Sequence, residues 1–194
     1  MALQQLDPDS IVVLGGDGAV EDGVVSALGE YADTERLAGA NRYETAVQVS
    51  QSHAEDADIV FLASGKDYPD ALAAAAAAGM EDAAVLLTRP DLLPSATSAE
   101  LSRLSPETVY VIGGDGAVSD EVATAAGASA GEVVRLGGTN RYGTAASVAA
   151  EFFPTPGPAP SWRRRGVPGR PRGGPGGGDE QHGGAAHPDR CPAR

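Results

Sequence analysis

The sequence predicts an α/β fold in which a small parallel sheet is flanked by helices. Short apolar runs alternate with segments of helical spacing, and residues 59–63 form the clearest strand. This alternation favours a parallel sheet with right-handed crossovers. Two motifs also recur, because residues 13–20 return as 111–118 at an offset of 98, and residues 36–47 return as 135–146 at an offset of 99. Two motifs at nearly one period predict a small Rossmann-like module in a tandem repeat of about 99 residues.

Five strands and five helices are predicted in alternating order. The strands are the apolar runs at residues 11–14, 33–37, 59–63, 85–88 and 108–112. The helices are the segments of helical spacing at 20–28, 42–53, 71–78, 95–104 and 119–126. Asn41 and Asp70 are expected N-caps, Gly29 is an expected helix end, and Pro90 and Pro94 bracket the turn before the fourth helix. The alanine surface of the third helix permits close packing against a sheet.

The sequence G-G-D-G-A-V follows the first strand and the last. It supplies six turn glycines: Gly15, Gly16, Gly18, Gly113, Gly114 and Gly116. A glycine loop before a helix can bind phosphate. However, this loop lacks the third glycine of G-x-G-x-x-G and the Lys-Ser/Thr of a P-loop. We therefore interpret both copies as tight structural turns.

Charge divides the chain into two parts and excludes several functions. Up to Pro160 there are 7 Lys and Arg against 24 Asp and Glu, and beyond it there are 7 against 3. The acidic first part lacks the basic face that nucleic acids require, and no apolar run is long enough to span a membrane. Cys191 is the only cysteine and lies in the second part. We therefore expect neither a disulfide nor a cysteine-based metal site in the first part.

Four motifs in one order carry a family resemblance. They are R-L-A-G-A-N-R-Y-E-T-A, A-S-G-K-D-Y-P-D-A-L-A, V-L-L-T and V-I-G-G-D-G-A-V, within residues 11–153. This pattern resembles the cell wall binding repeat 2 family of bacterial surface proteins. The resemblance implies a non-enzymatic module that anchors a surface protein non-covalently to an anionic cell-wall polymer. It also implies an extracellular, wall-bound location, other repeats of the same kind as partners, and no cofactor.

Five segments follow from the period and the resemblance. They are an N-terminal lead at 1–10, the C-terminal part of a preceding repeat at 11–35, a complete repeat at 36–134, the start of a further repeat at 135–153, and a Pro/Gly/Arg-rich disordered tail at 154–194. The chain has no signal peptide, so we expect it to be a fragment of a longer secreted protein. Shifted by one nucleotide, codons for the tail can encode repeat-like residues. We therefore hypothesise a frameshift between Phe153 and about Val167.

The recurring N-R-Y motif supplies most candidate binding residues. The polymer-binding candidates are Arg36, Asn41, Arg42, Tyr43, Lys66, Asp70, Asn140, Arg141 and Tyr142. Arginine presents a planar fork of donors to carboxylate or phosphate, and tyrosine offers a face to a sugar ring. The alternative is structural: Asn41 caps its helix while Arg42 pairs with an acidic side chain such as Asp70 and locks neighbouring modules.

Lys66 is the only lysine and lies on the loop after the central strand, where open α/β sheets bind ligands. With Ser64, Asp67, Tyr68 and Asp70 it forms a predicted polar pocket. No Ser-His-Asp, H-E-x-x-H or C-x-x-C pattern is present, so no catalytic or metal-binding residue is predicted. Two rival functions stay open: a Rossmann-like enzyme fragment that uses a nucleotide or sugar-nucleotide, and a structural spacer repeat.

Overall fold

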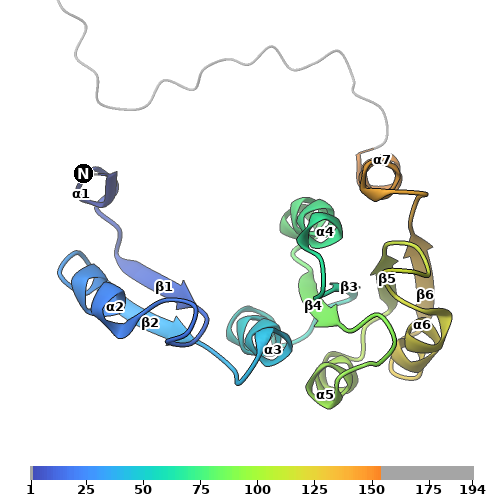
Figure 1. Ribbon diagram of the computed structural model, residues 1–194, viewed down its shortest axis with the longest axis horizontal. Helices are drawn as coiled ribbons and strands as arrows, with labels where there is room; N and C mark the ends of the chain where they lie inside the picture. The colour runs from blue at the N-terminus through green and yellow to red at the C-terminus, as the bar shows by residue number, and fades with distance from the viewer. Residues whose placement is uncertain (1, 154–194) are drawn as a thin grey trace, which may run out of the picture. The chain divides into compact units, whose positions relative to one another are not determined.

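The computed structural model describes residues 2–153. The predictions for 154–194, the disordered tail and the frameshift, lie outside the described residues. The helices are α1 (Ala2–Leu6), α2 (Asp22–Leu28), α3 (Arg42–His53), α4 (Tyr68–Glu81), α5 (Ser95–Leu104), α6 (Asp120–Gly127) and α7 (Arg141–Phe152). The strands are β1 (Ser10–Leu14), β2 (Asp33–Leu37), β3 (Ile59–Ser64), β4 (Ala84–Thr88), β5 (Thr108–Ile112) and β6 (Glu132–Leu136), as Figure 1 shows.

The strands form two parallel sheets. Four strands pair in the order β4-β3-β5-β6, and β1 pairs with β2 in a separate two-stranded sheet. The centre of the larger sheet is β3, in which Val60, Phe61, Leu62 and Ala63 have no exposed surface. A strand buried on both faces carries a continuous apolar run, which is the pattern that predicted it. The structure therefore confirms the predicted α/β fold with parallel strands.

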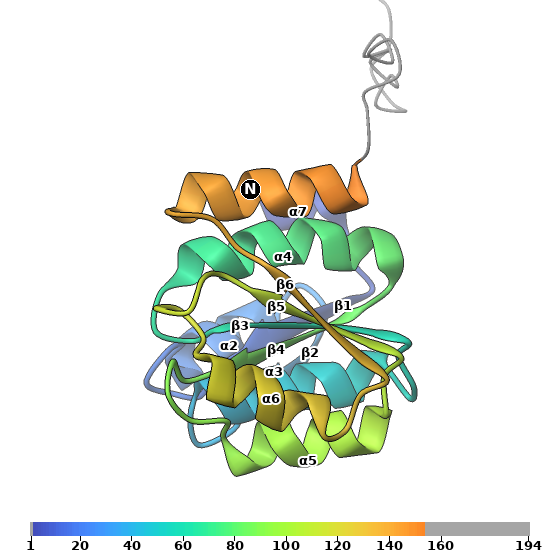
Figure 2. The same cartoon turned by 90° about the vertical axis from the view of Figure 1, so that its right-hand side faces the viewer.

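Helices cover both faces of the four-stranded sheet. Helices α4 and α7 lie on one face and α3, α5 and α6 on the other, as Figure 2 shows. On the first face, the buried alanines Ala74 and Ala77 of α4 pack in one core with Phe61 and Ile112. The small side chains let the helix backbone approach the sheet closely, as the alanine surface predicted.

The predicted N-cap role of Asp70 is wrong. Helix α4 begins at Tyr68, so Asp70 lies inside its first turn, and Asp67 occupies the cap position without a side-chain cap bond. The cause is Pro69, because proline fits the first helical turn, where no amide donor is needed. The helix also extends beyond the predicted residue 78 to Glu81.

Three elements were not predicted as helices or strands. They are the five-residue helix α1, the strand β6 and the helix α7. The strand β6 crosses the repeat boundary predicted after residue 134, and it completes the same sheet as β3, β4 and β5. The four-stranded sheet therefore does not end where the predicted repeat 36–134 ends. The tandem repeat itself stays a prediction.

Candidate functional site

Three cations gather in one hollow at the carboxyl ends of β3 and β4. The hollow has a volume of about 740 Å³ and is lined by Arg42, Tyr43, Gly65, Lys66, Arg89, Pro90 and Asp91, which we call the basic hollow. It lies where parallel α/β sheets place their ligands, outside the carboxyl ends of the strands. The chain has seven Lys and Arg up to Pro160, and three of them line this hollow with a single acidic residue.

A helix cap fixes the first two residues of α3. The side chain of Asn41 accepts hydrogen bonds from the backbone amides of Tyr43, at 3.0 Å, and Glu44, at 3.1 Å. Glu44 reaches back and accepts from the Ala40 amide and from the Asn41 side-chain amide. This reciprocal arrangement resembles a capping box, but the backbone amide that Glu44 accepts from is that of Ala40, one residue before the cap. It holds Arg42 and Tyr43 at the mouth of the hollow.

Gly65 contacts the side chains of both Arg42 and Tyr43. Its carbonyl accepts a hydrogen bond of 2.6 Å from Arg42 Nη1, and its amide donates to the Thr88 carbonyl at the end of β4. A Cβ atom at this position would lie 2.6 Å from Tyr43 Cε1. Only glycine therefore allows the tyrosine ring to lie directly on the loop that follows β3.

Arg89 completes the cluster from the end of β4. Its guanidinium carbon lies 5.8 Å from the centre of the Tyr43 ring, within the range of a cation–π contact. Lys66 follows Gly65 and is exposed. Sequence reasoning missed Arg89, although it directly follows the V-L-L-T strand at the same sheet edge as Lys66.

The second N-R-Y motif has different surroundings. Asn140 caps α7 as Asn41 caps α3, by accepting from the amides of Tyr142 and Gly143. A smaller pocket of about 260 Å³ lies beside it, lined by Asp67, Pro69, Asp70, Gly114, Gly116, Ala117, Gly138, Thr139, Asn140, Arg141 and Thr144. Arg141 therefore shares its pocket with two carboxylates, and Tyr142 is 79% exposed. The two copies of the motif have opposite electrostatic environments.

Asp70 does not pair with Arg42. It lies close to the turn at Gly113, where a Cβ would come within 2.8 Å of its Oδ2, and its Oδ1 is buried without a hydrogen-bond partner. Arg42 instead uses the Gly65 carbonyl. The structural alternative of an Arg42–Asp70 lock is therefore not the arrangement that the structure adopts.

Arg36 lies on β2, outside the basic hollow, and its side chain reaches the turn that follows β1. It donates to the carbonyls of Gly15, at 2.6 Å, and Val20, at 2.8 Å, and pairs with Asp22 at 3.0 Å. Arg135 repeats this pattern at the other turn with Gly113, Val118 and Asp120. Each arginine thus holds a glycine turn closed.

The glycine turns use their own donors internally. Gly15 and Gly113 have φ angles of 102° and 107°, which only glycine adopts without strain. The Gly15 amide donates to Leu37, and the amides of Ala19 and Val20 donate to Gly16. Together with the hydrogen bonds from Arg36 to the Gly15 and Val20 carbonyls, these bonds close the loop on itself, which favours a tight turn.

Residues 2–153 show neither a cluster of metal-ligating side chains nor a membrane-spanning helix. Within that range no group of three or more His, Cys, Asp or Glu is placed to hold a metal ion. None of the helices described there is long and apolar enough to cross a membrane.

Part of the chain matches a known protein family. Residues 36–123 match the family described as Cell wall binding domain 2 (CWB2). The N-acetylmuramoyl-L-alanine amidase LytC of Bacillus subtilis (strain 168) is 37% identical over 114 residues, which are 59% of this chain and 23% of that protein. The Amidase enhancer of the same organism is 35% identical over 119 residues, 61% of this chain and 17% of that protein. The chain therefore spans less than a quarter of either relative.

Two solved structures share the fold. Cwp8 from Clostridium difficile superposes with a TM-score of 0.66 and 25% identity, covering 76% of this chain and 25% of that one. Cwp6 from Clostridium difficile superposes with a TM-score of 0.56 and 37% identity, covering 59% of this chain and 18% of that one.

Proposed function

Because residues 36–123 match the CWB2 family, we propose that the basic hollow binds an anionic polymer of the bacterial cell wall. The observation that carries this proposal is the gathering of Arg42, Lys66 and Arg89 around Tyr43 in an otherwise acidic chain. An acidic protein repels an anionic polymer at most of its surface. Binding is therefore confined to the place where cations outnumber acids.

The chemistry of the hollow suits a charged sugar polymer. Arg42 and Arg89 offer planar forks of donors to phosphate or carboxylate, and Lys66 adds a compact charge on a flexible stem. Tyr43 lies between them and offers part of its ring to a sugar face. Arg89 also stacks over that ring, so the tyrosine and the cation are held together before the polymer arrives.

Arg36, Asp70 and the second motif take other roles in this proposal. Arg36 closes a turn, and Asp70 buries a carboxylate oxygen beside Gly113. Arg141 shares its pocket with Asp67 and Asp70, so an anion there meets two negative charges. We therefore assign to Asn140, Arg141 and Tyr142 a weaker contribution to polymer binding than that of their counterparts Asn41, Arg42 and Tyr43.

We further propose that the module anchors and does not catalyse. Both relatives have names that refer to an amidase, but this chain matches less than a quarter of each. A single hollow of this kind gives weak binding, and several linked copies multiply it through effective concentration. The proposed location is accordingly the cell wall of the bacterium that secretes the protein.

A cell-wall pull-down tests the proposal. The full chain is incubated with purified Gram-positive walls, before and after chemical removal of their anionic polymers, at low and moderate salt. We expect binding that falls with salt, because exposed charges are screened, and that disappears with the polymer. Arg42→Ala, Lys66→Ala and Arg89→Ala should each weaken binding about threefold to tenfold, as expected for one charge-assisted contact.

A matched control separates local from overall charge. Ala125→Glu on the exposed surface of α6 makes the chain more negative by the same one unit. It should leave binding within about twofold of the unchanged chain. Equal losses in Ala125→Glu and Arg42→Ala would mean that net charge alone governs binding, and folded protein that binds no wall would favour the spacer function.

A further inference from the structure

The N-terminal elements expose large apolar side chains. Among the described residues, Leu6 on α1 is 72% exposed, Val12 and Leu14 on β1 are 44% and 54% exposed, and Val24 on α2 is 50% exposed. We use the name docking face for these four residues together; their counterparts 98 positions later belong to the cores on both faces of the four-stranded sheet. Exposed apolar patches of this kind commonly mark an interaction site.

Each of these residues has a counterpart 98 positions later in the chain. The counterparts Leu104, Ile112 and Val122 are only 5%, 0% and 2% exposed. The fourth counterpart, Tyr110, is half-buried and packs against Phe61. The same apolar positions are therefore exposed in α1, β1 and α2 and largely covered in their second copy, which is the end of α5 with β5 and α6.

The two sets of elements also have matching backbones. Strand β1 pairs with β2 from Ser10↔Asp33 onward, and β5 pairs with β6 from Thr108↔Glu132 onward, each over five residue pairs. The helices that precede them end alike, because Asp7 and Ser105 have positive φ angles of 45° and 46°. Helix α1 thus corresponds to the last turn of α5, and the difference between the two copies lies in what covers them.

A strand–helix–strand unit covers the second copy. Strand β3 pairs along the edge of β5, and β4 pairs along the other edge of β3. On one face Ala74 and Ala77 of α4 join Ile112 in the core. Within residues 2–153 no strand pairs with the free edge of β1, and Leu14 has no helix in the position that α4 takes over Ile112.

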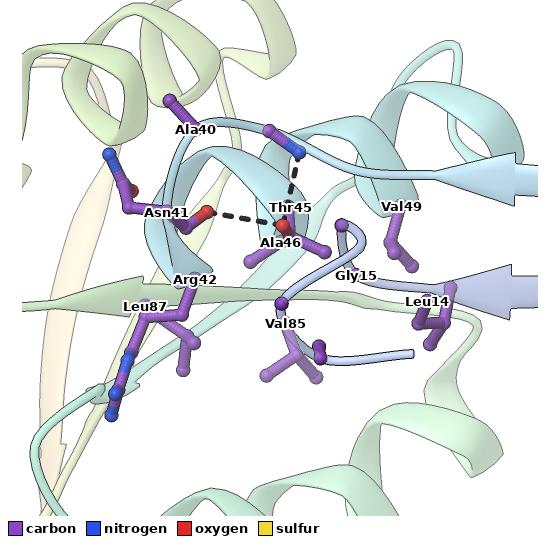
Figure 3. Close-up of a pocket in the computed structure, with 14 residues that line it drawn as sticks. Leu14, Gly15, Ala40, Asn41, Arg42, Thr45, Ala46, Val49, Val85 and Leu87 are labelled. Carbon is purple, nitrogen blue, oxygen red and sulfur yellow. Dashed lines mark hydrogen bonds between the residues drawn. The ribbon is translucent and has the colours of Figure 1, made fainter. Parts of the chain in front are cut away.

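A pocket occupies that position. It has a volume of about 620 Å³ and is lined by Leu14, Gly15, Gly16, Gly18, Ala19, Gly39, Ala40, Asn41, Arg42, Thr45, Ala46, Val49, Val85 and Leu87; Figure 3 labels ten of them. The corresponding pocket of the second copy is only about 260 Å³, because the start of α4, at Asp67, Pro69 and Asp70, closes it. The larger pocket is therefore the space that the first turns of an α4-like helix fill.

We propose that the docking face and this pocket receive a β3–α4–β4 unit from a further repeat of this kind. The incoming strand pairs with the free edge of β1, and the incoming alanine-rich helix lies over Leu14 with its first turns in the pocket. Another molecule of this chain is not the source, because its own β3–α4–β4 unit is already packed between β5 and α7. The proposal does not depend on polymer binding.

Thiol labelling of an extended chain tests this assignment. A copy of residues 36–99 is placed directly before Ala2, so that α1 continues the copied α5, and Cys191→Ser removes the native thiol. Val24→Cys reports on the docking face, and Val122→Cys is the matched reporter in the second copy. We expect labelling at position 24 to slow about tenfold or more on extension, whereas position 122 is protected in both chains.

A second substitution and a second readout complete the test. Changing the copied Leu62 to Arg should restore fast labelling at position 24, because Leu62 shares the buried core of Val122, the counterpart of Val24, and a long charged side chain cannot enter it. Hydrogen exchange at the amides of Val12 to Leu14, measured without any reporter, should slow in the extended chain. Unchanged labelling and exchange on extension would overturn the proposal. Concentration-dependent protection of position 24 in the unextended chain would also overturn it, because it would identify another molecule of the chain as the occupant.

Discussion

Ser50 on α3 donates a hydrogen bond of 2.7 Å to the buried Glu100 on α5. Gln51 and Arg103 donate to the same carboxylate, and Arg103 also donates to the carbonyls of Ala54 and Glu55 after α3. The side chain of Glu100 is 1% exposed and that of Arg103 is 36% exposed. This polar cluster fixes α3, which carries Arg42 and Tyr43 at its other end, against α5.

Glu100 makes the stability of the module sensitive to acid. Burial raises the pKa of its carboxyl, but hydrogen bonds from Arg103, Ser50 and Gln51 together outweigh burial and hold the pKa below its ordinary value of 4.5. A lowered folded pKa contributes stability above pH 4.5, and the contribution is lost as the pH falls through the folded value. Urea unfolding at several pH values should show this loss in the unchanged chain and a smaller one in Glu100→Gln.

Glu100→Ala gives the size of the effect at neutral pH. We expect a loss of about 3 kcal/mol, because removal of the carboxylate leaves the buried Ser50 hydroxyl without its acceptor and Arg103 without its charged partner. Glu107→Ala, a change of the same type at a residue outside this cluster, should cost less than about 1 kcal/mol. Equal effects of the two substitutions would contradict the structural role of Glu100.

Arg135 is expected to stabilise the turn after β5. It donates to the carbonyls of Gly113 and Val118 and pairs with Asp120, so Arg135→Ala leaves two partly buried acceptors without their charged donor. We expect a loss of about 2 kcal/mol in urea unfolding. Arg135→Lys should recover little of it, because an ammonium group cannot span the carbonyls and the carboxylate as the guanidinium fork does.

Arg36→Ala is the matched comparison for Arg135→Ala. It breaks the same set of bonds in the turn after β1, which belongs to the separate two-stranded sheet. We expect faster hydrogen exchange at the amides of Ala19 and Val20 and a smaller change in global unfolding. A loss of wall binding larger than that caused by Arg42→Ala would indicate that Arg36 binds the polymer directly.

The fold was largely predictable because its signals are local. The apolar run of β3, the spacing of α3 and the turn glycines each reflect burial or backbone geometry within a few residues of sequence. The basic hollow was only partly predictable: Arg42, Tyr43 and Lys66 stood out, but Arg89 joins them only through the parallel pairing of β3 and β4. The Glu100 cluster depends on a contact between residues fifty positions apart, which no local pattern encodes.

The two helix caps separate helix stability from polymer binding. Asn41 and Asn140 accept the same pair of amide bonds at the starts of α3 and α7. Asn41→Ala and Asn140→Ala should therefore each cost about 1 kcal/mol in unfolding experiments. Only Asn41→Ala should also weaken wall binding, because its helix start carries Arg42 and Tyr43. Equal weakening by both substitutions would indicate that the second motif binds the polymer as strongly as the first.

Gly65 offers a test of the hollow that changes no charge. In Gly65→Ala the new methyl group collides with the Tyr43 ring, since a Cβ lies 2.6 Å from Cε1, and it also lies 3.4 Å from Arg42 Cδ. The tyrosine must move away, and with it the surface over which Arg89 stacks. We expect wall binding to fall about threefold or more while the free energy of unfolding changes by about 1 kcal/mol. Gly116→Ala is the control, because nothing lies within 4 Å of a Cβ at that turn glycine. If Gly65→Ala binds walls as the unchanged chain does, the arrangement of Tyr43 is irrelevant to binding, and the polymer contacts the cations alone.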